Sequence, residues 1–415
     1  MKKNVLKDNG SVEYTATSNS NRMSETNFEA KEPSLGYYYQ LRIGVYLILK
    51  ARDKPKTIIK IESLDDVVLH DTNSMNLYQT KLHINSVANL TNSSPDFWKT
   101  IRIWSENILL GNVILENTLF TLMTTARIGN GSFIENLKFE NQIRDTGSIL
   151  KSMLKIADES TSSTNAKAYE AFKKLSEDQQ IQLINRINVL DNSLSIDEAL
   201  NLIQAELRYA AHPKKLNSLI ERLEGWWFQL CINMLQNKIE NISLQELQIK
   251  IAGINDSLME DNLPDDFASP IDIDETELED YNERIFVNQL KIIAVKSNMV
   301  RSAINDFHRA FKQRSKWLRE ELTSINDEDL FENRLEDHWN NIFSMIKDEC
   351  EGLDEANLMK IGYDFYKKFY VEKVPPIKIR ERFTSEYLTR GSCHILSDKK
   401  RIGWHPNYNT LLNDI

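Results

Sequence analysis

The chain has 415 residues, 41% of them hydrophobic, which excludes a disordered protein and predicts two or three domains with real cores. Its three cysteines are odd in number and widely spaced, which excludes a disulfide scaffold and favours a reducing, cytoplasmic location. No apolar run approaches the roughly 18 residues of a membrane span, and the first residues lack the apolar core of a signal peptide. We therefore expect a cytoplasmic protein with no membrane partner.

The formal net charge of −10 argues against a nucleic-acid partner, but the charge is unevenly distributed. Residues 1–150 hold 17 Lys and Arg against 16 Asp and Glu, so the remaining residues carry a net charge of −11. The first part of the chain can therefore approach DNA without a large electrostatic penalty.

Residues 1–33 are polar and predict a flexible arm. The stretch "SLGYYYQLRIGVYLILK" then begins with a Ser cap signal and continues as an apolar helix. Within residues 58–83, "IIKIES" alternates apolar and polar residues, "DDVVLHD" is rich in β-branched residues, and "LYQTKLH" follows a turn. These patterns predict three short strands.

The next stretch, "SPDFWKTIRIWSENILL", returns to helical spacing, with four large side chains on one face: Phe97, Ile101, Trp104 and Ile108. "TLFTLMTTARI" then predicts a buried strand. The order helix, three strands, helix, strand predicts a compact α/β domain over residues 34–150, with a mixed sheet flanked by helices.

Beyond residue 150 the spacing is almost entirely helical, which predicts a helical domain over residues 151–376. It is interrupted at 259–283, where two prolines and a run of acids predict a solvated loop. Residues 377–415 lose the helical period and predict a small irregular C-terminal cap.

The stretch 58–83 also carries the residues most suggestive of chemistry. Gln79 and Lys81 are two apart in a strand, so they share one face, and Asp66 begins the strand before them. Carboxylate and amide oxygens suit Mg²⁺, and Glu62 would complete its ligand set. Lys81 would then orient a water or stabilise charge on a scissile phosphate.

Glu62, Asp66, Gln79 and Lys81 resemble the core motif of PD-(D/E)xK restriction-endonuclease-like nucleases. The segments "GYYYQ", "WKTIRIWSE" and "LFTLMTTA" resemble, more narrowly, the endonuclease domain of bacterial anti-phage effectors. Further along, "LEGWWFQLCINML", "DNLPDDF", "INDFHRAFKQRSKWLREEL" and "RGSCHILSDKKRIGWHPNY" resemble the helical body and tail of Lamassu-type effector nucleases.

This resemblance implies a largely sequence-nonspecific double-stranded DNA endonuclease that uses Mg²⁺, or Mn²⁺ in its place. It also implies that an SMC-type ATPase and an accessory subunit hold the resting chain, which self-associates as a dimer or tetramer once released. We expect the docking surface for those partners in residues 377–408.

Some assignments stay open in the sequence. Either Asp65 or Asp66 would be the metal ligand, and we favour Asp66 because it leads its strand. Gln79 stands where the general motif has an acid, which removes one negative charge from the metal site. Gln40 either enters the site from the first helix or remains a surface amide.

Other features have a structural and a functional interpretation. Cys393, His394 and His405 would be a zinc site or part of a packed cap around Trp404, and their irregular spacing favours the cap. The basic helix "HRAFKQRSKWLRE" would contact a DNA backbone or, as we favour, be solvated or paired with the acidic loop. The alternative to the enzyme is a non-catalytic adaptor of an SMC-type ATPase complex.

Overall fold

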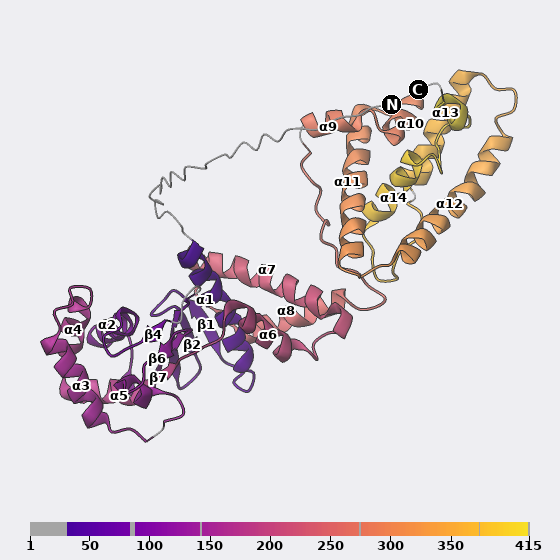
Figure 1. Cartoon of the computed structure of the whole chain (residues 1–415). Helices are drawn as coiled ribbons and strands as arrows, with labels where there is room; N and C mark the ends of the chain where they lie inside the picture. Colours follow the sequence, from indigo (N-terminus) through magenta and orange to yellow (C-terminus); the bar gives the residue numbers. More distant parts are fainter. Residues whose placement is uncertain (1–30, 84–87, 142, 274, 373, 414–415) are drawn as a thin grey trace, which may run out of the picture.

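The computed structural model describes residues 31–83, 88–141, 143–273, 275–372 and 374–413, so nearly all of the predicted arm lies outside them. Two lobes follow one another along the chain (Figure 1). An α/β lobe runs from helix α1 (Lys31–Lys50) to α8 (Leu244–Ser257), and a helical lobe begins at α9 (Glu275–Tyr281).

A mixed six-stranded sheet in the order β7-β5-β3-β2-β1-β8 forms the centre of the α/β lobe. The strands β1, β2 and β3 are antiparallel neighbours, whereas β3, β5 and β7 run parallel. The predicted order of helix, three strands, helix and strand is therefore confirmed. The strands are β1 (Ile58–Ile61), β2 (Val67–His70), β3 (Met75–Lys81), β5 (Thr118–Thr124), β7 (Ile187–Leu190) and β8 (Ile242–Ser243), with a separate parallel pair β4 (Asn89–Leu90) and β6 (Arg127–Ile128).

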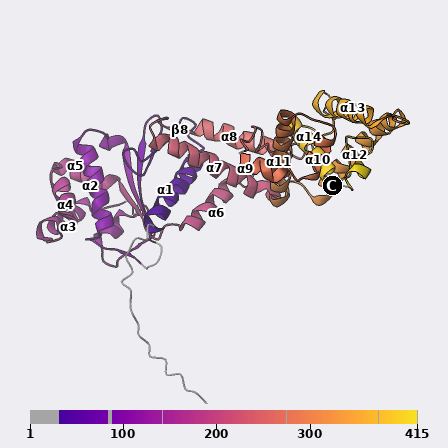
Figure 2. The same ribbon diagram turned by 90° about the horizontal axis from the view of Figure 1, so that it is seen from above.

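Helices cover both faces of this sheet because its strands alternate apolar side chains between two cores. Ile59 and Ile61 join the core formed with α1 and α7, and Leu77 and Phe120 join the opposite core. Figure 2 shows the sheet between α1 and α7 on one side and α2 to α5 on the other. The helices are α2 (Pro95–Leu109), α3 (Thr146–Glu159), α4 (Ala166–Lys173), α5 (Glu177–Arg186), α6 (Ile196–Leu207) and α7 (Leu216–Leu235), with short turns η1 (Leu115–Asn117), η2 (Phe133–Leu137) and η3 (Pro213–Lys215).

The α/β lobe extends well past residue 150, where the sequence predicts its end. Strands β7 and β8 lie at the two edges of the sheet, although both come from the stretch predicted to be helical. They have four and two residues, too few for alternation to reveal them.

The helical lobe is built around α11 (Ser297–Arg319) and α14 (Glu386–Asp398), which pack closely against each other. A Cβ at Gly391 would overlap the carbonyl oxygen of Asp306, so this contact requires a glycine. The other helices are α10 (Ile285–Ile292), α12 (Ile325–Asp348), α13 (Glu355–Tyr366), the π-helical η4 (Lys367–Glu372) and α15 (Tyr408–Leu411).

The predicted irregular cap at 377–415 is instead a central part of this lobe. Leu388, Leu396 and Trp404 are buried in its core, and α14 is a regular helix of 13 residues. The segment "RGSCHILSD" lacks a helical spacing of apolar residues because small and polar residues occupy its buried positions. Gly391 and Ser392, for example, lie against α11 at close range. Its buried side chains cannot serve as the expected docking surface while the lobe is folded.

The acidic stretch 259–283 also differs from a solvated loop. Its first part runs along α11, where Gln313 Oε1 accepts a hydrogen bond from the backbone N–H of Asp266 at 2.8 Å. Arg309 donates to the carbonyl oxygens of Phe267 and Ala268. Backbone groups of residues 266–268, which a solvated loop would leave to water, are therefore bonded to α11. The last part of the stretch forms α9.

The basic helix is engaged within the protein, as the structural interpretation predicts. Lys316 pairs with Asp266 of the acidic stretch at 3.0 Å, and Arg314 is buried against Glu328 and Glu332. Arg309, Arg314 and Lys316 of this helix therefore stabilise the lobe and are not directed at DNA.

Candidate functional site

The hairpin β2–β3 brings two of the predicted site residues together. Val67 pairs with Tyr78 in the antiparallel register, and continuing it by one residue sets Asp66 opposite Gln79. Opposed residues of an antiparallel pair lie on the same face of a sheet. Lys81, two residues after Gln79, ends β3 on the same side, so the backbone register sets Asp66 near the end of β3 that carries Gln79 and Lys81.

Glu62 joins this cluster from the end of β1. Its backbone N–H donates to the carbonyl oxygen of Asp66 at 3.0 Å, so the two acids leave the β1–β2 connection side by side. Glu62 has φ of +50°, in the left-handed region that residues other than glycine rarely adopt. Such strained positions concentrate at functional sites.

Gln40 of α1 enters the cluster, which resolves one of the open alternatives. Its Nε2 donates to Glu62 Oε1 at 3.1 Å and to the carbonyl oxygen of Asp66 at 2.8 Å. The side chain is 4% exposed and is therefore not a surface amide. Gln40 fixes the positions of both acids relative to the helix.

Asp66 is held by its neighbour across the hairpin. One carboxylate oxygen, Oδ2, accepts from the backbone N–H of Thr80 at 2.7 Å and from its hydroxyl at 2.9 Å. Thr80 lies between Gln79 and Lys81 in the sequence, and nothing in the pattern predicts its role. The contact depends on the hairpin register, which only the folded sheet defines.

Asp65 and Asp66 point in different directions. Asp65 is 6% exposed, and its carboxylate accepts from the indole Nε1 of Trp104 at 2.6 Å and from the backbone N–H of Asp66 at 3.0 Å. Burial raises the pKa of Asp65 to about 7, and the hydrogen bond from Trp104 opposes the shift. Asp65 therefore belongs to the core beneath α2, and Asp66 is the acid that lines the surface cavity.

That cavity, of about 760 Å³, lies between the start of α1, the ends of β1 to β3, and α2. It brings together Glu62, Asp66, Lys81 and Gln40. Burial raises the pKa of Glu62, and the hydrogen bond from Gln40 and the charge of Lys81 only partly offset it. The remaining lining residues are Pro33, Gly36, Tyr37, Thr80, Leu82, His83, Asp96 and Lys99.

Gln79 is the predicted site residue that does not line the cavity. It is 2% exposed, and its Oε1 is buried without a hydrogen-bond partner among the described residues. A buried amide oxygen without a donor is costly. An amide oxygen is a ligand that a hard cation accepts, so the orphaned Oε1 is chemically compatible with a metal on this side of β3.

The acids alone do not make a metal site. In the part of the chain that the structure describes, no group of three or more His, Cys, Asp and Glu side chains is placed to hold a metal ion. A metal here would need Gln79 or a backbone carbonyl beside Glu62 and Asp66. The same finding covers Cys393, His394 and His405, which are not arranged as a zinc site.

His394 is instead a neutral core residue. It lies among Phe286, Tyr370 and Trp404, and neither ring nitrogen has a hydrogen-bond partner among the described residues. Burial lowers the pKa of His394 to about 3, and the nearby charge of Arg390 acts in the same direction. The packed interpretation of this segment therefore holds.

A second polar group lies on the cavity wall. His83 Nε2 lies 2.9 Å from Asp96 Oδ2, and the backbone N–H of His83 donates to Thr125 Oγ1 at 2.8 Å. Lys99 follows one turn after Asp96 on α2. The sequence signal for this group was weak, because the connection from β3 to α2 sets which residues face the cavity.

One comparison with known proteins finds a match within the helical lobe. Residues 286–412 match C-terminal domain 7 of the ABC-three component (ABC-3C) systems. No curated protein matches the chain. Among the described residues, no helix is long and apolar enough to cross a membrane.

Solved structures of low similarity include two Cap4 SAVED/CARF-domain containing receptors. The Moraxella osloensis receptor is 16% identical over 53% of this chain and 47% of its own, with a TM-score of 0.36. The Acinetobacter baumannii receptor with the cyclic trinucleotide 2'3'3'-cAAA is 12% identical over 53% and 44%, with a TM-score of 0.33. The chain spans about half the length of these receptors, and scores this low do not establish a common fold.

The match to domain 7 indicates a component of a bacterial anti-phage ABC-three component system.

Proposed function

We propose that this chain is a metal-dependent DNA endonuclease and the effector of its defence system. The observation that carries the proposal is the convergence of Glu62, Asp66 and Lys81 on one cavity, with Gln40 bonded to both acids. Acids and an ammonium brought together from three strands are typical of phosphodiester hydrolysis. We also propose that the α/β lobe has a restriction-endonuclease-like fold and that the chain is a Lamassu-type effector, as the resemblance of its sequence implies.

Asp66, Gln79 and Glu62 would hold Mg²⁺, or Mn²⁺ in its place. The bound ion would supply a polarised water and neutralise charge on the scissile phosphate. The two hydrogen bonds from Thr80 hold one oxygen of Asp66, which leaves the other to face the cavity. Gln40 keeps Glu62 in place, so both acids are oriented before a substrate binds.

Lys81 would stabilise the negative charge that grows on the phosphate during hydrolysis. Lys99 and His83 on the same wall would bind neighbouring phosphates of the strand. No element for reading bases is evident in the described part of the chain, so cleavage should be nearly independent of sequence. It should also fall steeply as salt concentration rises, because phosphate contacts release counterions.

The test is nicking of a supercoiled plasmid by the purified full-length chain, with Mg²⁺ and with EDTA. Lys81→Met should lower the rate by about 100-fold or more, the usual cost of one lost transition-state charge contact. Lys60→Met removes a lysine from β1 that pairs with Glu240, away from the cavity, and should cleave as the wild type does. Circular dichroism spectra would verify that both variants are folded.

Cleavage at the wild-type rate by Lys81→Met, or in the presence of EDTA, would rule out this site. A chain that never cleaves but still binds the other components would instead be a non-catalytic adaptor, the alternative function. The plasmid assay separates the two because an adaptor has no use for the Glu62–Asp66–Lys81 cluster.

A double-strand break requires two sites that face opposite strands, so the active form should contain at least two copies. We infer that partner proteins, an SMC-type ATPase and an accessory subunit, hold the resting chain singly and that release permits a dimer or tetramer. Mass photometry of the isolated chain at activity-assay concentrations tests this. A strictly monomeric chain that cuts both strands would contradict it.

A further inference from the structure

The first turns of α1 line the cavity of the proposed active site, and the proposed chemistry gives a role to only one of their residues. Four residues of α1 face the cavity: Pro33, Gly36, Tyr37 and Gln40. Spacings of three and four residues put these positions on one face of a helix. Gln40 holds the two acids, so this face extends from the acids toward the beginning of α1.

Tyr37 presents a free aromatic ring on this face. The residue is 62% exposed, and it has no hydrogen bond or ring contact with the described residues. The next residue, Tyr38, is also exposed but lies against Phe228, with ring centroids 6.3 Å apart. The ring of Tyr37 is therefore available to a molecule that enters the cavity.

Gly36 lies beside Tyr37, and its neighbours do not require a glycine. It is inside a helix, where glycine is less favourable than alanine. A Cβ at Gly36 would have no described atom within 4 Å. Glycine also permits a close approach of the backbone to a ligand. Because Gly36 lines the cavity, its Cβ would occupy space next to a bound substrate.

The charges of the cavity indicate which part of a nucleotide α1 contacts. Lys81 of β3 and Lys99 of α2 lie on the wall that also carries His83. None of the four α1 residues that line the cavity is charged. Phosphates of a DNA strand bind cationic side chains. The wall formed by α1 therefore contacts the uncharged part of the backbone, the deoxyribose.

The rise of the helix sets how far this contact lies from the acids. Tyr37 is about 4.5 Å from Gln40 along the axis of α1, at about 1.5 Å per residue. Successive nucleotides of a duplex are spaced by roughly 3.4 Å along its axis. The ring therefore lies within one or two nucleotides of the acids that Gln40 holds.

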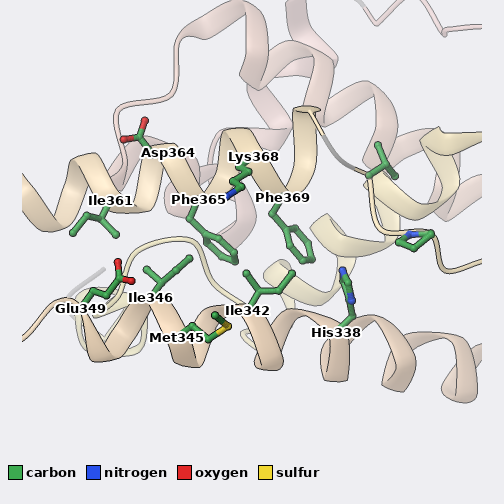
Figure 3. A pocket seen from close by; sticks show the side chains of 12 residues that line it. His338, Ile342, Met345, Ile346, Glu349, Ile361, Asp364, Phe365, Lys368 and Phe369 are labelled. Carbon is green, nitrogen blue, oxygen red and sulfur yellow. The ribbon is translucent and has the colours of Figure 1, made fainter.

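A cavity of about 610 Å³ in the helical lobe, between α12 and α13, is of a different kind. Figure 3 shows Phe365 and Phe369 directed toward Ile342 and Ile346, and Asp364 directed away from α12. Both phenylalanines are 4% exposed and belong to the core of the lobe. That cavity therefore belongs to the packing of the helical lobe rather than to a substrate site.

We propose that Gly36 and Tyr37 contact the substrate. The ring of Tyr37 packs against the deoxyribose of a nucleotide next to the scissile phosphate, and Gly36 lets the strand approach α1. This inference rests on the proposed function, which makes DNA the substrate. Because the sugar is the same in every nucleotide, the contact increases affinity without reading sequence.

The experiment measures binding of the full-length chain to a short fluorescein-labelled DNA duplex in EDTA, by fluorescence anisotropy. Tyr37→Ala should weaken binding about fivefold, as expected when roughly 40 Å² of apolar ring surface leaves the interface. Tyr37→Phe keeps the ring and should bind as the wild type does. Tyr38→Ala is the matched control, because it removes the neighbouring exposed ring, and it should also bind normally.

The salt dependence of binding separates an apolar contact from a phosphate contact. Tyr37→Ala should leave the slope of log K against log salt concentration unchanged, because a contact with deoxyribose releases no counterion. Lys99→Met should reduce the magnitude of that slope by about 0.9, the value for one phosphate of duplex DNA. A reduced slope in Tyr37→Ala would overturn the proposal, because it would show that phosphate contacts had been lost.

Gly36→Ala gives a signature that a folding defect cannot produce. It should leave the α/β lobe equally stable or more stable in urea unfolding, and it should still weaken DNA binding. Gly253→Ala of α8 is the matched control, because a Cβ there also has no described atom within 4 Å and the residue lies outside the cavity. It should bind DNA normally. Normal binding by Gly36→Ala would refute the close approach.

A chain that lacks residues 1–30 should show the same loss of binding from Tyr37→Ala. A loss that disappears with this deletion would overturn the proposal, because the ring would then contact that segment and not DNA.

Plasmid cleavage with Mg²⁺ distinguishes this inference from the proposed function. Weaker DNA binding by Tyr37→Ala in a chain that never cleaves would overturn the nuclease assignment alone. Cleavage by a chain whose Tyr37→Ala and Gly36→Ala variants bind DNA normally would overturn the α1 contact alone. A wild-type chain that does not bind DNA would overturn both.

Discussion

Glu332 is the buried centre of an ion cluster that joins α11 and α12 to the residues that follow α14, and its neutralisation should destabilise the helical lobe. Its carboxylate, 3% exposed, accepts hydrogen bonds from three cations: Arg314 at 2.6 Å, Lys399 at 2.8 Å and Arg401 at 2.6 Å. Glu332→Gln keeps the volume of the side chain and removes its charge. Any loss of stability is then electrostatic and not the result of a cavity.

The magnitude follows from what the three cations can do without the carboxylate. Breaking a buried ion pair costs about 3–5 kcal/mol when the remaining charge stays buried and unpaired. Here Lys399 and Arg401 are 50% and 29% exposed and can turn to water, and the buried Arg314 keeps Glu328 at 2.5 Å. We therefore expect the free energy of unfolding to fall by about 2–3 kcal/mol.

Hydrogen–deuterium exchange by mass spectrometry measures this effect within one lobe. Peptides from α12 and α14 should lose protection in Glu332→Gln, and peptides from β3 and β5 should not. Glu336→Gln is the matched control, because Glu336 is 30% exposed and bonds only Arg401 in this cluster. Its cost should be about 1 kcal/mol or less. Equal protection in Glu332→Gln and the wild type would refute the reasoning.

Gly391→Ala should destabilise the protein by about 2 kcal/mol or more in urea unfolding, because its Cβ would overlap Asp306; Gly253→Ala, with nothing within 4 Å, should be neutral or stabilising. Asp65→Asn should keep most plasmid cleavage, whereas Asp66→Asn should lose it; the reverse order would move the catalytic acid by one residue. The hydrogen bond from Arg380 lowers the pKa of Asp327 to about 2, against 3.8 ordinarily. Since the pKa is lower in the folded state, this pair stabilises the protein above pH 3.8 and loses that effect as pH falls toward 2. Arg380→Gln should reduce the acid sensitivity by ~1 kcal/mol, measured by urea unfolding at pH 3 and pH 7.

Local pattern was enough to predict the first helix and strands of the α/β lobe and to bring Glu62, Asp66 and Lys81 to one place. Alternation in β1 and β3 sets which side chains share a face, and a tight hairpin leaves few ways to pair β2 with β3. Asp66, Gln79 and Lys81 are therefore close together for reasons that lie within about 20 residues of sequence.

Only the tertiary structure decided the finer arrangement of that site. Gln40 reaches Glu62 and Asp66 because α1 packs across the sheet, and Trp104 of α2 draws Asp65 into the opposite core. Two adjacent acids look equivalent in the sequence. Their roles differ because partners far along the chain bury one and leave the other at a cavity.

The same distinction explains the helical lobe. Helical spacing correctly predicted α11 and α12, whose apolar residues recur every three or four positions. It failed for α14, because a helix surrounded by other helices is buried on several sides and has small and polar residues, such as Gly391 and Ser392, at its contacts. Regular spacing of apolar residues reveals a helix that has one buried face. A helix enclosed on all sides lacks that spacing, so it becomes evident only when its neighbours are in place.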